Sequence, residues 1–369
     1  MSEQAIPGSP LSAMGWGSES TVVICPRCDW RFLGKRGRMQ QNCPHCHQGM
    51  LEEYAGDLNM LADFIKPPEI YLPFEVPVAT LDAKLQAFSR SIPFAPTDLN
   101  LTNLKQRLRM IYIPLWLVDS DVEATWRAEC AYPYQVKSHK EQLVGGRWTT
   151  QEVLETKLGW DKRAGSLKRS YQNVSAPALE AHASLMTALG NYDTQRAKPA
   201  SAEILFRESG SLPAMVSIAS RDKDDAWPDT TPRFQELASR EARQACAAED
   251  IREFAWDATY SNQNWSMFLL PVLSSYYLDD ENKAQIVIAN GQSGALSGSR
   301  RASLIQAKKA VRNRLIAAFV LLSIAILIGL LSLAVDGIGA LAVIVLFVAV
   351  IVGLSALQPI PAVQRINQT

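Results

Sequence analysis

The chain has 369 residues, of which 47% are hydrophobic, and its formal net charge is zero. The charge is segregated: about −2 in residues 1–20, +4 in 21–50 and −8 in 51–299, with the balance in a cationic stretch before an apolar tail. The acidic central region argues against a broad phosphate-binding face there, because Lys and Arg supply most non-specific affinity for nucleic acid. Any nucleic-acid contact is therefore expected within the first fifty residues.

Residues 1–20 are predicted to be a disordered lead-in. They contain two Glu, no Lys or Arg, and scattered Pro and Gly. This composition matches neither a secretory signal nor a transit peptide. So little apolar surface does not offset the conformational entropy lost on ordering.

The next segment, residues 21–50, is dominated by two CxxC pairs. Cys25 and Cys28 form the first pair, Cys43 and Cys46 the second, and fourteen residues separate them. This spacing is typical of zinc ribbons. Four thiolates complete a tetrahedral shell and leave no position for water, so we expect one structural Zn²⁺ and no metal-activated hydrolysis. Two disulfides, an iron site and a degenerate ribbon without metal are the alternatives.

Two histidines accompany the second CxxC pair. His45 or His47 could replace a cysteine as ligand, but four thiolates already complete the shell, so both are expected at the surface. The 21–50 segment is too short to bury an adequate core. Metal binding is therefore expected to supply most of its folding free energy.

The same segment interleaves aromatic and basic residues. The candidate partner contacts are Arg27, Trp30, Arg31 and Phe32. A protein-binding surface would use Trp30 as an anchor inside a basic rim. A surface for nucleic acid would set cations on phosphates and an aromatic ring on a base. In the third interpretation, the two rings only cover the metal site.

Residues 51–69 are predicted to be a linker, followed by a mixed α+β domain over 70–299. Helical periodicity favours helices at 81–90, 97–110 and 234–254, and extended patterning favours a strand at 110–126. In that strand, one face would carry Ile111, Ile113, Leu115 and Leu117. The fold class expected for the whole chain is α+β.

A hairpin is expected near the end of this domain. Strand-like segments 265–277 and 284–289 bracket a polar turn, and Pro271 confines the first strand to a sheet edge or a bend. The glycines at 291, 294 and 298 follow. They lack the Lys-Ser/Thr ending of a phosphate-binding loop, so a turn with positive φ is favoured over phosphate binding.

No catalytic constellation is evident in the sequence. His139 and His182 lack any HxxxH, HExxH or GxSxG context. Cys130 and Cys246 are solitary in sequence and are expected to be buried small hydrophobic residues, with a nucleophilic role as the alternative. We therefore predict that the protein is not an enzyme.

The C-terminal region is predicted to be a transmembrane hairpin over 315–357. Two uncharged segments, 315–335 and 338–357, are each about 20 residues long, enough to cross a bilayer. Asp336 and Gly337 would form the turn. The small-xxx-small pairs Ala325/Gly329 and Ala349/Gly353 would allow the two spans to pack closely.

The flanking charges predict the orientation. A basic juxtamembrane segment at 300–314 precedes the hairpin, and a short tail at 358–369 follows it. The positive-inside rule places both termini in the cytoplasm, and CxxC thiols that stay reduced agree with that compartment. The candidate contacts with lipid head groups are Arg300, Arg301, Lys308, Lys309, Arg312 and Arg314.

Several central motifs resemble those of a known family. They occur in the order Tyr71-Leu-Pro-Phe74, Phe94-Ala-Pro96, Tyr112-Ile-Pro-Leu-Trp116, Trp160-xxxx-Gly165, Tyr171-Gln-Asn-Val174 and Asn290-Gly-Gln-Ser-Gly294. With the CxxC pairs, they resemble a family of bacterial membrane-anchored zinc-ribbon proteins, often automatically labelled primosomal helicase (replication factor Y)-like. The helicase label fails here, since no GxxxxGK[ST] loop is present and the chain is too short for two motor lobes.

The resemblance implies a cytosolic ribbon and an α+β domain on a hairpin in the inner membrane. It also implies a scaffold whose partners resemble flotillin-type or phage-shock-type membrane proteins. The expected function is a membrane-tethered adaptor for protein partners. The alternatives are a membrane-tethered nucleic-acid-binding protein and, below it, an enzyme acting near the membrane.

Overall fold

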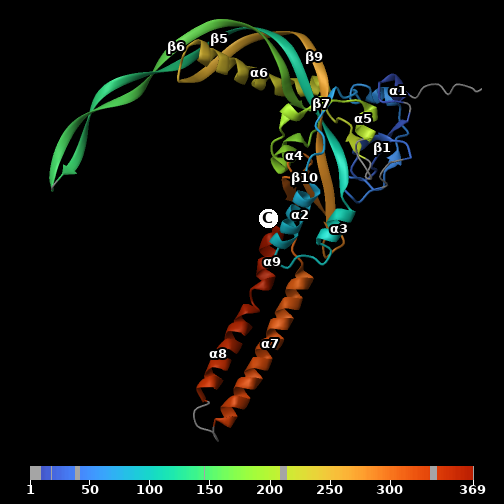
Figure 1. Ribbon diagram of the computed structural model, residues 1–369, viewed down its shortest axis with the longest axis vertical. Helices are drawn as coiled ribbons and strands as arrows, with labels where there is room; N and C mark the ends of the chain where they lie inside the picture. The colour runs from blue at the N-terminus through green and yellow to red at the C-terminus, as the bar shows by residue number, and fades with distance from the viewer. Residues whose placement is uncertain are drawn as a thin grey trace, which may run out of the picture.

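The computed structural model describes residues 10–17, 19–37, 42–144, 146–207, 214–332 and 339–368. Within these residues the fold is mixed α+β, with one large sheet and two long apolar helices at the C-terminal end (Figure 1). The strands follow the order β11-β10-β9-β5-β8-β2-β1-β3, while β6 pairs with β5, and β4 pairs with β7 and β9.

The strands have the following bounds: β1 Ser20–Ile24, β2 Arg31–Lys35, β3 Glu52–Glu53, β4 Ile70–Tyr71, β5 Arg109–Val144, β6 Arg147–Pro177, β7 Lys198–Pro199, β8 Met215–Ser217, β9 Asp250–Leu278, β10 Ala284–Asn290 and β11 Leu296–Gly298. The helices are α1 Pro10–Ala13, α2 Val78–Ser91, α3 Leu101–Gln106, α4 His182–Leu189, α5 Ala202–Arg207, α6 Lys223–Ala245, α7 Leu304–Leu331, α8 Gly339–Ser355 and α9 Pro359–Gln368.

Strand β5 confirms the extended segment predicted from residue 110 and shows why it is so apolar. Ile111 and Ile113 face one buried cluster, which includes Val23 and Phe32 of the ribbon. The intervening Tyr112, Trp116 and Val118 face a second cluster on the opposite side of the sheet. Both faces of this part of the strand are buried, because side chains alternate between the two faces.

The strand continues far beyond residue 126 into an arm, defined here as the paired parts of β5, β6 and β9 beyond the body (Figure 1). At about 3.3 Å per residue, the 36 residues of β5 have a contour length on the order of 120 Å. Helix α6 covers part of the arm, where Phe234 packs against Tyr171 and Tyr260. The sequence did not predict this arm.

Two predicted helices have different bounds. The helix expected at 97–110 is confined to α3, and Arg109 already belongs to β5. The helix expected at 234–254 begins earlier, because the Asp222 side chain accepts a hydrogen bond from the Asp225 N–H (2.8 Å) and caps α6. It ends at Ala245, and Phe254 lies in β9.

The predicted hairpin is confirmed, but the expectation for Pro271 is wrong. Strands β9 and β10 pair from Leu278↔Ala284 to Val272↔Asn290, and β9 lies centrally between β10 and β5. The Pro271 carbonyl accepts from the Gly291 N–H (2.9 Å), just past the last pair with β10. The N–H that proline lacks would point to this same side. Pro271 therefore removes no hydrogen bond between β9 and β5.

The lead-in differs from the predicted disorder where the structure describes it. Leu11 and Trp16 are buried in the same cluster as Tyr112 of β5. The Trp16 Nε1–H also donates to the Ile65 carbonyl (2.9 Å). Their apolar surface offsets the entropy of ordering, which the Pro- and Gly-rich composition concealed. Ile65 and Leu61, in the segment expected as a linker, belong to the same core. Residues 1–9 lie outside the described residues.

The two apolar helices are long enough to span a membrane, and only 6% and 11% of their most apolar windows are buried. Within α7 and α8, the buried residues are Ala325 and Ala349, together with Ala307 near the start of α7. Ala325 and Ala349 belong to the predicted small-xxx-small pairs, so small residues form the close contact. The predicted turn residues Asp336 and Gly337 lie outside the described residues.

The predicted tail is a helix that returns to the body. In α9, Val363 is fully buried. It belongs to a third cluster of buried residues, which also contains Leu85 of α2 and Tyr277 of β9. The Asn367 side-chain amide accepts a hydrogen bond from the Ala302 N–H (2.9 Å) and donates one to the Ala302 carbonyl (3.1 Å). The chain is therefore attached to the body at both ends of the hairpin.

This attachment is tested by Val363→Asp, which places a carboxylate in an apolar cluster at a cost of about 3 kcal/mol. We expect α9 to detach, which would be measured as faster proteolytic cleavage after Arg365 in the detergent-purified protein. The control is Gln364→Asp, at an exposed neighbour. Equal cleavage rates in the two variants would contradict the docking of α9.

Candidate metal centre

The four cysteines of the two CxxC pairs converge on one point. The distance between the Cys25 and Cys46 Sγ atoms is 3.7 Å, and that between Cys28 and Cys43 is also 3.7 Å. All four sulfur atoms lie within 4.8 Å of one another. A tetrahedral ion with metal–sulfur bonds of about 2.3 Å requires sulfurs about 3.8 Å apart. The four thiols could therefore hold a metal ion without rearrangement of the backbone.

The two CxxC turns have the same backbone geometry. In each, the N–H of the residue after the second cysteine donates to the carbonyl of the first: Asp29 to Cys25 and His47 to Cys43, both at 2.9 Å. Asp29 and His47 also share a positive φ, 58° and 55°. Two equivalent turns supply two sulfurs each, as a four-thiolate site requires.

Gly49 is a residue of this site that the sequence interpretation missed. An added Cβ would lie 2.4 Å from Cys25 Sγ and 3.2 Å from Arg27 Cβ. The Gly49 carbonyl also accepts from the Cys43 N–H (2.8 Å). Only glycine allows the backbone to approach the sulfur atoms so closely. Its position three residues after Cys46 was the available signal.

Burial changes the proton affinity of the thiols. It raises the pKa of Cys28 to about 12 and also raises the pKa of Cys43. Backbone N–H groups of His45 and Cys46 oppose this for Cys43, because a hydrogen bond to sulfur favours the thiolate. In the metal-free protein these two thiols therefore hold their protons at neutral pH, and a bound metal must displace them.

The two histidines are not at the surface, contrary to the prediction. The His47 ring is buried, stacks on Tyr276 with a centroid distance of 4.8 Å, and places Nε2 2.7 Å from Ser274 Oγ. The His45 ring is partly buried and stacks on Trp30 at 3.8 Å. Burial lowers the pKa of His47 to about 3 and that of His45 to about 4, which keeps both rings neutral. His47 therefore attaches the metal centre to the body, whereas His45 packs within the ribbon. Neither histidine is among the grouped metal donors.

The candidate partner contacts have unequal exposure. Arg27 is exposed, and Trp30 and Arg31 are partly buried. Phe32 has no exposed surface, because β2 pairs with β8 at Phe32↔Ser217 and its ring faces the core. Phe32 is therefore wrong as a contact residue and belongs to the structural cover of the site.

A cavity of about 250 Å³ adjoins the metal centre. Its lining comes from the first CxxC turn, the start of β2, and the segments before α4 and after β8: Cys28, Asp29, Trp30, Arg31, Leu179, Glu180, Ala181, Ile218, Ala219 and Ser220. It therefore lies between ribbon and body. Its charged lining residues are two acids and one Arg, a mixed character that the basic sequence of the ribbon did not predict.

The two cysteines outside the ribbon are not solitary in space. Cys130 is buried on β5, and its thiol is within hydrogen-bonding contact of Cys246, the residue that ends α6. Burial raises the pKa of Cys130 to about 11, which opposes a nucleophilic role at neutral pH. More than a hundred residues separate the two positions, so no local pattern could have placed them together.

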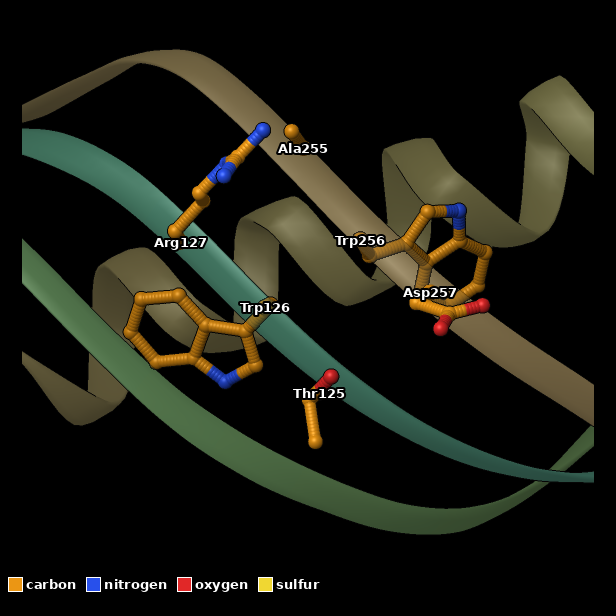
Figure 2. Close-up of a pocket in the computed structure, with 6 residues that line it drawn as sticks. All are labelled: Thr125, Trp126, Arg127, Ala255, Trp256 and Asp257. Atoms are coloured by element: carbon orange, nitrogen blue, oxygen red, sulfur yellow. The ribbon is translucent and has the colours of Figure 1, made fainter.

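A second cavity, of about 290 Å³, lies on the arm (Figure 2). Residues of β5 and β9 line it: Thr125, Trp126, Arg127, Ala255, Trp256 and Asp257. The two tryptophans are directly opposed in the register of the two strands. The ionisable lining residues are Arg127 and Asp257, and the lining contains no cysteine and no histidine. The cavity offers polar and aromatic contacts to a ligand.

Comparison with protein-family models, with curated proteins and with solved structures finds no match for this chain.

The role of Gly49 is tested by Gly49→Ala, whose methyl group would force the Cys25 sulfur to move. We expect at least a tenfold weaker metal affinity, measured by competition with a chromophoric chelator. Gln48→Ala, at the exposed neighbouring position, is the control and should bind as the unmodified protein does. Unchanged affinity of Gly49→Ala would mean that the sulfur arrangement tolerates the methyl group.

Metal affinity should increase with pH. The thiols of Cys28 and Cys43 have raised pKa values and release protons when metal binds, so raising the pH favours the bound state. Two displaced protons give a change of roughly 100-fold per pH unit. Chelator competition at pH 6, 7 and 8 measures it, and a flat profile would show that the thiols are already ionised.

Proposed function

We propose that the protein is a membrane-tethered adaptor with a structural zinc ribbon, which binds protein partners at the cytoplasmic face of the inner membrane. The observation that carries this proposal is a pair of exposed apolar helices whose two outer ends are fixed to a folded body. These ends are the start of α7 and the helix α9 that follows α8. A buried helical pair in a soluble core would have its apolar surface covered. Both termini would be cytoplasmic by the positive-inside rule.

Zinc is the proposed ion. Four sulfur donors at tetrahedral spacing are the usual set for structural zinc. Such a shell has no open position for water, so the ion would stabilise the turns and take no part in hydrolysis. Strand β2 pairs with β8, and Cys25 and Cys43 lie in the same cluster as β5 residues. Zinc would thus support the junction between ribbon and body as well as the ribbon.

The surface beside the zinc ribbon is the proposed site for protein partners. Arg27 is exposed at its edge, and the cavity between ribbon and body offers the partly buried Trp30 as an apolar wall. Asp29 and Glu180 in the lining would accept hydrogen bonds from a polar side chain of the partner, and Arg27 outside the lining would pair with an acidic one. Anchoring of one side chain in such a cavity is a common basis of protein recognition.

Nucleic-acid binding is the alternative and has less support. One face of Trp30 is already stacked on His45, so that face is closed to a base. Two ribbon cations have acidic partners: Lys35 with Glu19 at 2.5 Å and Arg36 with Glu53 at 3.7 Å. These pairs reduce the charge available to phosphates. An enzyme acting near the membrane is the lower alternative.

Lipid contact is proposed for part of the basic segment. Arg300, Lys308, Lys309 and Arg312 are exposed where α7 leaves the body. The other two candidates serve the fold: Arg301 donates to the Asn367 carbonyl (2.6 Å) and Arg314 to the Ser355 carbonyl (2.5 Å). The four exposed cations would attract anionic head groups.

The family membership and the flotillin-type or phage-shock-type partners stay proposals that rest on the sequence resemblance. The exposed arm and the ribbon cavity support a scaffold, because they provide two separate surfaces for partners. A scaffold also requires no reaction chemistry.

The adaptor proposal is tested by Arg27→Glu in protein isolated from membranes in mild detergent. Charge reversal beside the cavity should lower the yield of co-purifying proteins at least fivefold, with no change after nuclease treatment. Lys223→Glu, an exposed reversal at the start of α6, is the control. If nucleic acid is the main companion and proteins are lost with nuclease, the nucleic-acid alternative replaces the adaptor.

A further inference from the structure

One edge of the arm is an open strand edge. Strand β9 follows β5 only as far as Ala131, which is opposite Asp250, and the Glu249 N–H donates to the Ala131 carbonyl (3.0 Å). Strand β6 stays paired with β5 to Val144. Among the described residues, no strand covers the side of β5 that β9 leaves. Beyond Ala131, the side of β5 that β9 covers closer to the body therefore has no partner strand among the described residues.

The alternation of the backbone determines which residues face this edge. The Ala131 carbonyl points to it, so every second residue from there directs its N–H and C=O groups the same way. These are Pro133, Gln135, Lys137, His139, Glu141 and Leu143. Proline has no N–H, and its place here fits an edge strand. From Gln135 to Leu143 the edge presents a full row of donors and acceptors.

The outer arm is also poorly covered on its faces. The pairs Leu143↔Trp148, Lys137↔Leu154 and Pro133↔Leu158 place these side chains on one face, because directly paired residues share a face. Trp148 is 72% exposed, and Leu143, Leu154 and Leu158 are exposed as well. A two-stranded arm in water is only marginally stable, and an uncovered edge strand offers its backbone N–H and C=O groups to another strand.

The charge pattern of this edge complements itself. Lys137 and Glu141 lie two residues to either side of His139 and on the same face. In an antiparallel pair of two such edges centred on His139, each Lys137 faces Glu141 of the other copy. Positions 137, 139 and 141 all direct their backbone groups to the edge, so the hydrogen-bonding groups meet in this register.

We propose that two copies of this chain pair arm to arm through the open edge of β5, antiparallel about His139. The contact is isologous, since each copy contributes the same segment. The arm extends to one side of the hairpin (Figure 1). The proposal requires no partner at the ribbon, so it stands or fails separately from the adaptor function.

The register is tested with His139→Cys in detergent-purified full-length protein under mild oxidation. Directly opposed residues in a hydrogen-bonded antiparallel pair have Cα atoms about 5.5 Å apart, within disulfide range. We expect a disulfide-linked dimer on a non-reducing gel, at least fivefold above the unmodified protein. Lys140→Cys is the control, because its self-distance of about 8 Å in this register exceeds that range. Equal cross-linking of the two variants, or none with His139→Cys, would overturn the proposal.

The charge complementarity has its own test in the unmodified background. Lys137→Glu and Glu141→Lys should each weaken dimerisation roughly tenfold, measured by concentration-dependent sedimentation, because each puts like charges opposite one another. Lys137 also pairs with Glu152 of its own chain at 2.6 Å, and Glu141→Lys leaves that pair intact. The double exchange of both residues should restore the dimer. Failure of Glu141→Lys to weaken it, or of the double exchange to restore it, would reject this register.

Discussion

The alternation of one strand, β5, is the constraint that organises this protein. Its first residues bury Ile111 and Ile113 on one face and Tyr112 and Trp116 on the other, so two cores share a single backbone. The same strand pairs with β8, which in turn pairs with β2 of the ribbon. It also pairs with β9, which precedes the hairpin in the chain. Past the body it becomes the centre of the arm. Metal centre, body and arm are therefore coupled through one run of hydrogen bonds.

The sequence predicted those features whose information is local. The CxxC spacing located the four thiols, the uncharged runs located α7 and α8, and the polar turn after β9 located the hairpin with β10. Features that depend on distant residues were missed. Trp16 is ordered by Ile65 and its neighbours, and His47 is buried by Ser274 and Tyr276. No pattern within a short window contains such partners.

The arm was missed for a different reason. Beyond residue 126 the alternation of apolar and polar residues weakens. Both faces of the outer arm are exposed to solvent, so there is no core that requires apolar side chains. Charged residues such as Lys137 and Glu152 pair across the strands there. A strand held by backbone pairing and by surface charges has no periodic apolar signature. The prediction therefore ended a few residues before the last buried positions of β5, Cys130 and Ala131.

The return of α9 to the body has a consequence for biosynthesis. Val363 belongs to the same cluster as Leu104 of α3 and Tyr277 of β9, although the whole hairpin lies between them and α9 in the chain. Synthesis proceeds from the N-terminus, so this cluster stays incomplete until both apolar helices have been synthesised and α9 has left the ribosome. Completion of the body core is thereby tied to placement of the hairpin. A chain that failed to insert would keep an apolar surface exposed, which cellular quality control can recognise.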